Sequence, residues 1–149
     1  MVGTVAHATV KKGRDVQKMV PLVFTDQFAA TRAFYTDQLG ATTVMEDGDN
    51  YLQVRFGSAE DRPELAFCPP LPEESPIGAQ PVYSQGLMVS IPVDDADAHR
   101  KGLVERGVDV PEPTDKPWGW RSFLLRDPAG VTLDFYHVIA DDASQDAAS

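Results

Sequence analysis

Cysteine is almost absent from this chain of 149 residues. Cys68 is the only one, so neither an internal disulfide nor a zinc site made of several thiolates can form. This usage fits a reducing compartment, and we predict a cytoplasmic protein. Cys68 ends a short apolar stretch, where a thiol most often serves as a small, inert hydrophobe.

Long apolar runs and common catalytic motifs are also missing. No stretch approaches the roughly 18 apolar residues of a membrane span, and residues 1–15 do not follow the pattern of a signal peptide. The sequence contains no phosphate-binding glycine loop, no nucleophile elbow and no zinc-protease helix. These absences argue against a membrane protein, a P-loop nucleotide-binding protein and a serine hydrolase.

Positive charge is scarce. The chain has 13 Lys and Arg against 23 Asp and Glu, a formal net charge of −10. Residues 1–15 carry +2 and residues 141–149 carry −3, which leaves −9 for the residues between them. Such a surface repels nucleic acid and anionic membranes and attracts cationic small molecules. Simple solubility is an equally good explanation of the charge.

The most structured pattern is a β-hairpin within residues 116–136. Residues 127–130, Asp-Pro-Ala-Gly, fit a type I turn, because Asp suits its first position, Pro its second and Gly its fourth. Residues 121–126 and 131–138 on either side are rich in aromatic and branched side chains, which favour strands.

The two halves of the chain repeat one order of elements. In each half an apolar strand is followed by an aspartate, a helix and a glycine; the aspartates are Asp26 and Asp94 or Asp95, and the glycines are Gly40 and Gly107. The aspartates are expected to cap the helix starts, and the glycines to adopt the left-handed conformation after the helix ends.

The organisation that follows is two modules with a linker and two flexible tails. We place the modules at 16–70 and 86–140, the proline-rich linker at 71–85 and the tails at 1–15 and 141–149.

Further strands follow each helix. We expect them at 51–56 and 64–68 in the first module, and at 108–110 and in the hairpin in the second. Each module then has the order βαβββ, and one such unit is too small to bury its sheet alone. The sequence therefore predicts an α+β fold of two tandem βαβββ modules with mixed sheets and the helices outside.

The chain resembles the vicinal oxygen chelate superfamily, which contains glyoxalases, bleomycin-resistance proteins and extradiol dioxygenases. The similarity covers about residues 16–138 and rests on Trp118, Gly119, Arg121, Phe123, residues 125–130 and Phe135, and on residues 20–22 and 34–40. The bleomycin-resistance branch is the most similar. The resemblance implies that the paired sheets form a cup, and that the cups lie at the interface of a homodimer.

In metal-binding members of that superfamily, four cup positions hold the metal. Matching the motifs places them here at Val20, Glu64, Met88 and Asp134. Two of these are apolar, whereas a divalent metal prefers imidazole or several oxygens. The three histidines do not substitute, because they stand in the N-terminal tail (His7), on the second helix (His99) and on the opposite face of the strand from Asp134 (His137). We predict no metal and no cofactor, with a divalent metal as the alternative.

Glu64 and Asp134 have two interpretations. Either acid could face solvent or pair with Arg55 or Arg121. Alternatively, both could lie in a partly apolar cup, where one acts as a general base or both bind a cationic group.

The aromatic loop before the hairpin suggests a ligand site. Trp118 and Trp120 flank Gly119 and could form two walls around a flat ligand, or could cover a core or a dimer interface. Arg121 could bind an anionic group of that ligand, or could pair with Asp115 or Asp134. Tyr51, Phe56 and Met88 are candidate wall residues, although most such side chains belong to a core.

The prediction for function is a metal-free homodimer that sequesters an aromatic, cationic natural product or antibiotic. Its partners are a small molecule and a second copy of the chain, with no nucleic acid and no membrane. The alternative is a glyoxalase-like isomerase or lyase, or less favourably a dioxygenase, that acts on a small organic substrate. An isomerase or lyase without metal would use Glu64 or Asp134 as its base.

Overall fold

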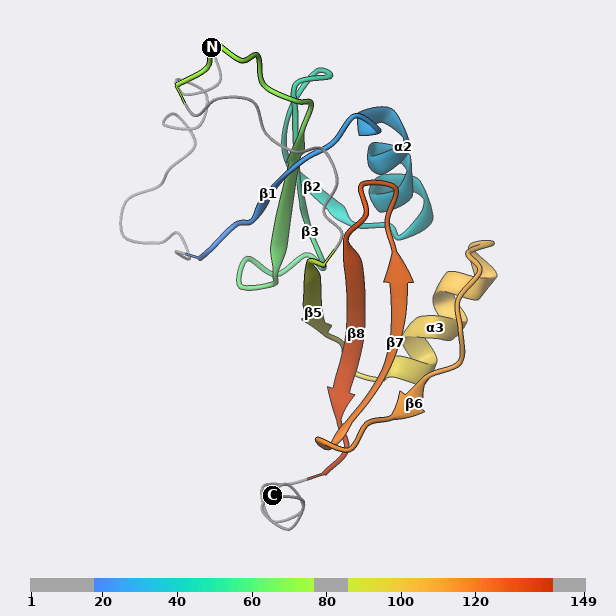
Figure 1. The fold of residues 1–149 in the computed structure, drawn as a ribbon. Helices are drawn as coiled ribbons and strands as arrows, with labels where there is room; N and C mark the ends of the chain where they lie inside the picture. The colour runs from blue at the N-terminus through green and yellow to red at the C-terminus, as the bar shows by residue number, and fades with distance from the viewer. Residues whose placement is uncertain (1–17, 77–85, 141–149) are drawn as a thin grey trace.

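The computed structural model describes residues 18–76 and 86–140, and it has the predicted α+β fold of two modules (Figure 1). The first sheet has the order β1-β4-β3-β2 and consists of β1 (Leu22–Phe24), β2 (Thr42–Asp47), β3 (Tyr51–Arg55) and β4 (Glu64–Cys68). The second has the order β5-β8-β7-β6 and consists of β5 (Met88–Pro92), β6 (Thr114–Asp115), β7 (Trp120–Arg126) and β8 (Thr132–Val138). In each sheet the first two strands in this order are parallel and the other neighbours are antiparallel.

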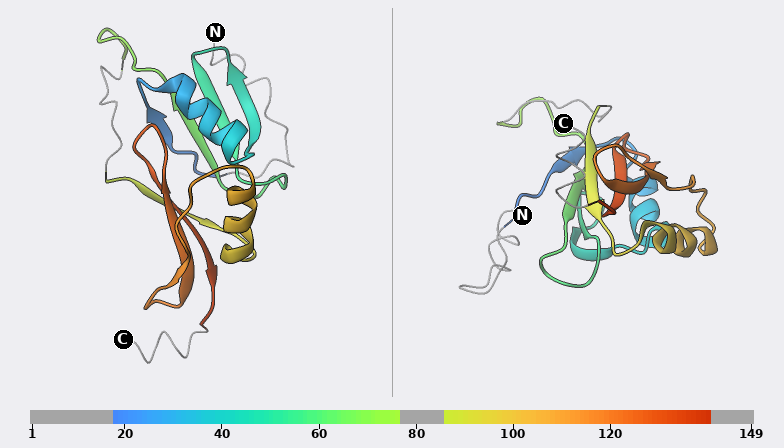
Figure 2. Two further views of the ribbon diagram at one scale, coloured as in Figure 1. Left: turned by 90° about the vertical axis from the view of Figure 1, so that its right-hand side faces the viewer. Right: turned by 90° about the horizontal axis from the view of Figure 1, so that it is seen from below.

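One helix packs against each sheet (Figure 2). In the first module, α2 (Phe28–Ala33) continues as the π-helical turn η1 (Phe34–Gln38). In the second, α3 (Ala96–Glu105) contacts β7 and β8. No helix in the described part of the chain is long and apolar enough to span a membrane.

The two modules repeat with the same strand register. The backbone N–H of Thr25 donates to the carbonyl of Cys68 (2.9 Å), and that of Val93 donates to the carbonyl of Tyr136 (2.8 Å). Both residues of the second bond stand 68 positions after their counterparts in the first. This offset identifies which residues of the two sheets are equivalent.

The helix ends follow the predictions at three of four places. The side chain of Asp95 caps α3 by accepting from the N–H groups of Asp97 and Ala98. Gly40 and Gly107 have the expected positive φ, 69° and 87°. The prediction for α2 was wrong. Asp26 points into solvent and makes no cap, and the hydroxyl of the buried Thr25 accepts the N–H of Gln27 instead (2.9 Å).

Two strands differ from the predictions. Residues 108–110 form no strand, because Val108 and Val110 insert into the core while the edge strand is β6, further along the chain. The sequence analysis did not predict the strand β2. Its side chains are mostly exposed, so its sequence lacks the alternation of apolar and polar residues that marks a half-buried strand.

One core runs through both modules. It contains Phe34, Tyr35, Phe67, Ile91, Leu103, Phe123 and Phe135, among others. The turn between β7 and β8 reaches α2 and η1 (Figure 1), where the hydroxyl of Tyr35 donates to Oδ2 of Asp127 (2.6 Å). At the end of α3, the guanidinium of Arg106 donates to the carbonyls of Asp37 and Gln38 (2.7 and 2.8 Å).

These bonds hold the two sheets in one arrangement. The module boundaries 16–70 and 86–140 stay a prediction. Most of the linker 71–85 and both tails lie outside the described residues, as does His7.

Candidate ligand site

Each sheet has one face that is turned away from its helix, which we call its helix-free face. Side chains alternate along a strand, so Leu133 and Phe135 of β8 enter the core while Asp134 and Tyr136 lie on the opposite side. The strand register then places eight side chains on the central part of the helix-free face of the second sheet: Met88, Ser90, Trp120, Ser122, Leu124, Thr132, Asp134 and Tyr136.

One end of this face is aromatic. The rings of Trp120 and Tyr136 are parallel, with centroids 3.7 Å apart and an interplanar angle of 11°. Trp118, in the loop before β7, is 52% exposed. Of the two tryptophans proposed as ligand walls, Trp120 therefore already has a stacking partner and Trp118 presents its ring to solvent.

The middle of the face contains a buried acid with an unsatisfied oxygen. Asp134 is 5% exposed, and its Oδ2 accepts from the hydroxyl of Ser90 (3.2 Å). Its Oδ1, and the hydroxyl of the buried Ser122 on the neighbouring strand, have no hydrogen-bond partner among the described residues. A buried polar atom without a partner costs about 1–3 kcal/mol, so both atoms favour a polar ligand or water beside them.

Glu64, on the first sheet, has hydrogen-bond donors for both of its carboxylate oxygens. Its Oε2 accepts from Nζ of Lys18 and Nε of Arg55, both at 2.9 Å, and its Oε1 accepts from Nε2 of Gln53 (2.6 Å). Burial alone would raise the pKa of this carboxyl, but these three donors outweigh burial and lower it. The structure thus shows the pairing with Arg55 that was one of the two interpretations of Glu64, and a saturated carboxylate makes a poor general base.

The register also shows that the two acids are not equivalent. Leu22 of β1 lies opposite Ala66, and Ser90 of β5 lies opposite Asp134. With the offset of 68 residues, Asp134 corresponds to Ala66 and Glu64 to Thr132. The two carboxylates therefore occupy positions along their strands that are not equivalent in the two sheets. The matched positions already differ along the chain, since Val20 and Met88 are 68 residues apart and Glu64 and Asp134 are 70 apart, but only the strand register shows that 68 is the offset between equivalent positions.

The remaining candidates do not gather at one place. Arg121 lies on the helix side of the second sheet, where it pairs with Asp97 of α3 (2.7 Å) and with Asp115 (2.8 Å). Phe56 packs edge-on against Tyr35 and Phe135 at the junction of the modules.

Tyr51 and Met88 lie on helix-free faces. The hydroxyl of Tyr51 donates to Oε1 of Gln53 on the first sheet (2.8 Å), and Met88, on the second, is 52% exposed. The structure thus brings together Trp120, Asp134 and Met88 on one face, and it adds Ser90, Ser122 and Tyr136, which the sequence did not single out. Only the period-2 alternation of β8 could have indicated Tyr136 beside Asp134.

The four positions matched to metal ligands do not form a donor set. Val20 offers no donor atom, the thioether of Met88 is a soft ligand that does not suit a hard divalent ion, and both oxygens of Glu64 accept from neighbouring side chains. Among residues 18–76 and 86–140, no three side chains of His, Cys, Asp or Glu gather closely enough to hold an ion. A divalent metal needs several such ligands, so the residues at these four positions do not fit one.

The sequence and the fold can be compared with known proteins. The family model described as Glyoxalase/Bleomycin resistance protein/Dioxygenase superfamily matches residues 7–135. The chain belongs to this superfamily. No curated protein matches the sequence.

Solved structures of the superfamily share the fold. A glyoxalase/bleomycin resistance protein/dioxygenase from Nocardioides has a TM-score of 0.65 at 19% identity, over 93% of this chain and 91% of that one. Lactoylglutathione lyase from Agrobacterium tumefaciens has a TM-score of 0.61 at 21% identity, over 83% and 94% of the two chains. The bleomycin-binding protein from Streptomyces verticillus, solved with copper(II)-bleomycin, has a TM-score of 0.58 at 22% identity, over 89% and 100%.

Proposed function

We propose that this member of the superfamily is a metal-free small-molecule-binding protein that sequesters an aromatic, cationic natural product or antibiotic. The observation that carries the proposal is the helix-free face of the second sheet, where the Trp120–Tyr136 stack lies on the same face as the unsatisfied Oδ1 of Asp134. A planar ring would stack at the aromatic end, and a cationic group would reach Asp134.

The buried charge in the middle of this face is the carboxylate of Asp134, whereas the one cation that the β7–β8 register places on the face, Arg126 opposite Thr132, is exposed at its end. Arg121, the residue predicted to bind an anionic group, is held by Asp97 and Asp115 on the other side of the sheet. The net charge of −10 also attracts cations at long range. Indole faces add attraction for a cation, by about 0.5–2 kcal/mol.

The proposed state is a homodimer. Leu22 on the first sheet, and Met88, Leu124 and Val138 on the second, are large apolar side chains exposed to solvent on the helix-free faces. A second copy of the chain covering these faces would bury them and turn two open sheets into walls of an enclosed site.

Among the structural neighbours, the bleomycin-binding protein was solved with its small-molecule ligand, which supports a role in binding a small molecule.

Quenching of tryptophan fluorescence by ethidium and by bleomycin tests the proposal, with light scattering on the same samples to report the dimer. We expect saturable quenching that Trp120→Ala abolishes. Asp134→Asn should weaken binding about 30-fold, since truncating one partner of a buried charge pair costs about 2–5 kcal/mol. The exposed Asp109→Asn makes the same charge change and should leave binding intact. If a wider panel of planar cations produced neither quenching nor a thermal shift, the proposal would be wrong.

An isomerase or lyase is the second candidate, and one observation favours it. Oδ1 of Asp134 is buried without a hydrogen-bond partner among the described residues and would accept a proton from a substrate that reaches it, whereas both oxygens of Glu64 are occupied. Elemental analysis of protein purified without chelators separates the two functions. Near-stoichiometric zinc, nickel, manganese or iron would favour the enzyme, and metal-free protein that turns nothing over would favour sequestration.

A further inference from the structure

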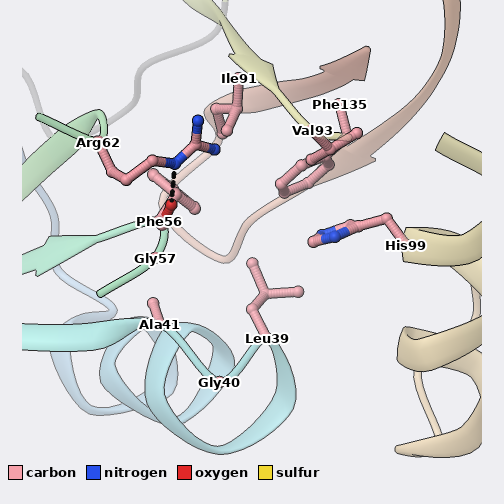
Figure 3. Close-up of a pocket in the computed structure, with 10 residues that line it drawn as sticks. All are labelled: Leu39, Gly40, Ala41, Phe56, Gly57, Arg62, Ile91, Val93, His99 and Phe135. Atoms are coloured by element: carbon pink, nitrogen blue, oxygen red, sulfur yellow. Dashed lines mark hydrogen bonds between the residues drawn. The ribbon is translucent and has the colours of Figure 1, made fainter. Parts of the chain in front are cut away.

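A cavity lies between the two modules on the side of the helices, away from the helix-free faces (Figure 3). Its volume is about 210 Å³, below the range of roughly 300–1,000 Å³ for sites of drug-sized ligands. The first module lines it with Leu39, Ala41, Phe56 and Arg62, and the second with Ile91, Val93, His99 and Phe135. The walls are mostly apolar, so the cavity suits a small ligand with an apolar body.

Arg62 reaches the cavity from the loop between β3 and β4. Its Nε donates to the carbonyl of Phe56 (2.8 Å), and its Nη2 donates to the carbonyl of Pro92 in the other module. These two bonds fix the guanidinium across the junction. Its Nη1 has no hydrogen bond to any described residue, so a charged donor remains available at the wall of an apolar cavity.

His99 enters the cavity from α3, opposite Arg62 (Figure 3). Its ring stacks on Phe135, with centroids 4.9 Å apart, and more distantly on Phe123. Neither ring nitrogen has a hydrogen bond to a described residue. Burial, and then the charge of Arg62, lowers the pKa of this imidazole, so its neutral form offers one N–H donor and one acceptor.

We propose that this cavity binds a small monocarboxylate with an aromatic or branched aliphatic tail. The guanidinium of Arg62 and the N–H of His99 would donate to the carboxylate, and the apolar walls would surround the tail. The charge of Arg62 would repel a cationic ligand. A neutral hydrocarbon would leave Arg62 and His99 without hydrogen-bond partners. A carboxylate therefore fits the cavity better than either.

This site is separate from the proposed ligand site on the second sheet. Phe135 points into the cavity, whereas its neighbours Asp134 and Tyr136 lie on the opposite face of β8. No tryptophan lines the cavity. Binding here would link the two modules, because residues of both contact the ligand.

Isothermal titration with benzoate tests the proposal on the full chain. We expect one saturable site per chain, and binding of the neutral analogue benzamide at least about tenfold weaker, because it lacks the negative charge that would pair with the guanidinium of Arg62. Ala41→Leu, which fills the cavity, and His99→Phe, which removes the donor, should each abolish saturable binding. Arg100→Gln on the same helix is the matched control and should not change it.

Three outcomes would overturn the proposal: no saturation at millimolar benzoate, equal binding of benzamide, or unchanged binding by Ala41→Leu and His99→Phe proteins that retain the wild-type melting temperature. Asp134→Asn should leave benzoate binding intact. This last variant distinguishes failure of the cavity proposal from failure of the sequestration proposal.

Discussion

The helix-free faces of the two sheets each contain one buried carboxylate, and the two carboxylates differ in their surroundings. Glu64 accepts from Lys18, Arg55 and Gln53. Asp134 accepts only from Ser90 and keeps one oxygen without a described partner. A carboxylate thus has all its acceptor atoms paired on the first sheet and keeps one oxygen unpaired among the described residues on the second.

The comparison predicts the largest effect at Glu64. Glu64→Gln leaves two half-buried cations without their acid and should lower the free energy of unfolding by about 3 kcal/mol, at the low end for a broken buried ion pair. Asp134→Asn should lower it by less than about 1 kcal/mol, since one oxygen of Asp134 has no bond to lose. Urea denaturation measures both, with the exposed Glu46→Gln as control. Equal losses in the two variants would refute the contrast.

A second prediction concerns the bond that joins the modules. Tyr35→Phe removes the hydroxyl that donates to Asp127 (2.6 Å) and leaves a buried carboxylate oxygen with one donor fewer. We expect a loss of about 2 kcal/mol in the free energy of unfolding. A single cooperative transition should remain, because one core runs through both modules. If the loss were negligible, the arrangement of the sheets would not depend on this bond.

The smallest effect is on the dependence of stability on pH, and its sign differs between the modules. The pKa of Glu64 is lowered from its ordinary value of 4.5. Its contribution is therefore complete above that value and is lost as the pH falls through the lowered pKa of the folded state. Burial raises the pKa of Asp127 above its ordinary 3.8, although bonds from Tyr35 and Val131 oppose the shift. Its contribution is complete below 3.8 and is lost as the pH rises through the raised pKa.

Denaturation midpoints measured between about pH 3 and pH 7 check these signs. Glu64→Gln should flatten the loss of stability at the acid end. Asp127→Asn should remove the loss that accompanies rising pH, whatever its effect on overall stability. A variant curve parallel to that of the wild-type protein would contradict the corresponding assignment.

Local sequence signals predicted much of the fold. The turn at residues 127–130, the cap at Asp95 and the two left-handed glycines depend on a few neighbouring residues, and all appear where the sequence places them. Predictions failed where distant parts of the chain decide. Val108 and Val110 fill the shared core and form no strand.

The candidate site was predicted less completely, for the same reason. Trp120 and Asp134 were recognised as residue types suited to ligands. Their position on one face, with Tyr136 stacked on Trp120 and Ser90 bonded to Asp134, depends on strand register. Register joins residues that are far apart in the chain, and spacing along the sequence does not encode it directly.

By itself, the sequence determined the two-module α+β fold and the superfamily, because turn chemistry, periodicity and repeated motifs are local properties of the chain. Only the tertiary structure decided which acid is saturated and which has an open oxygen. It also turned Arg121 away from the aromatic face and brought Arg62 and His99 to one cavity between the modules. Those outcomes depend on which side chains meet across strands and across the junction, and that is fixed by packing.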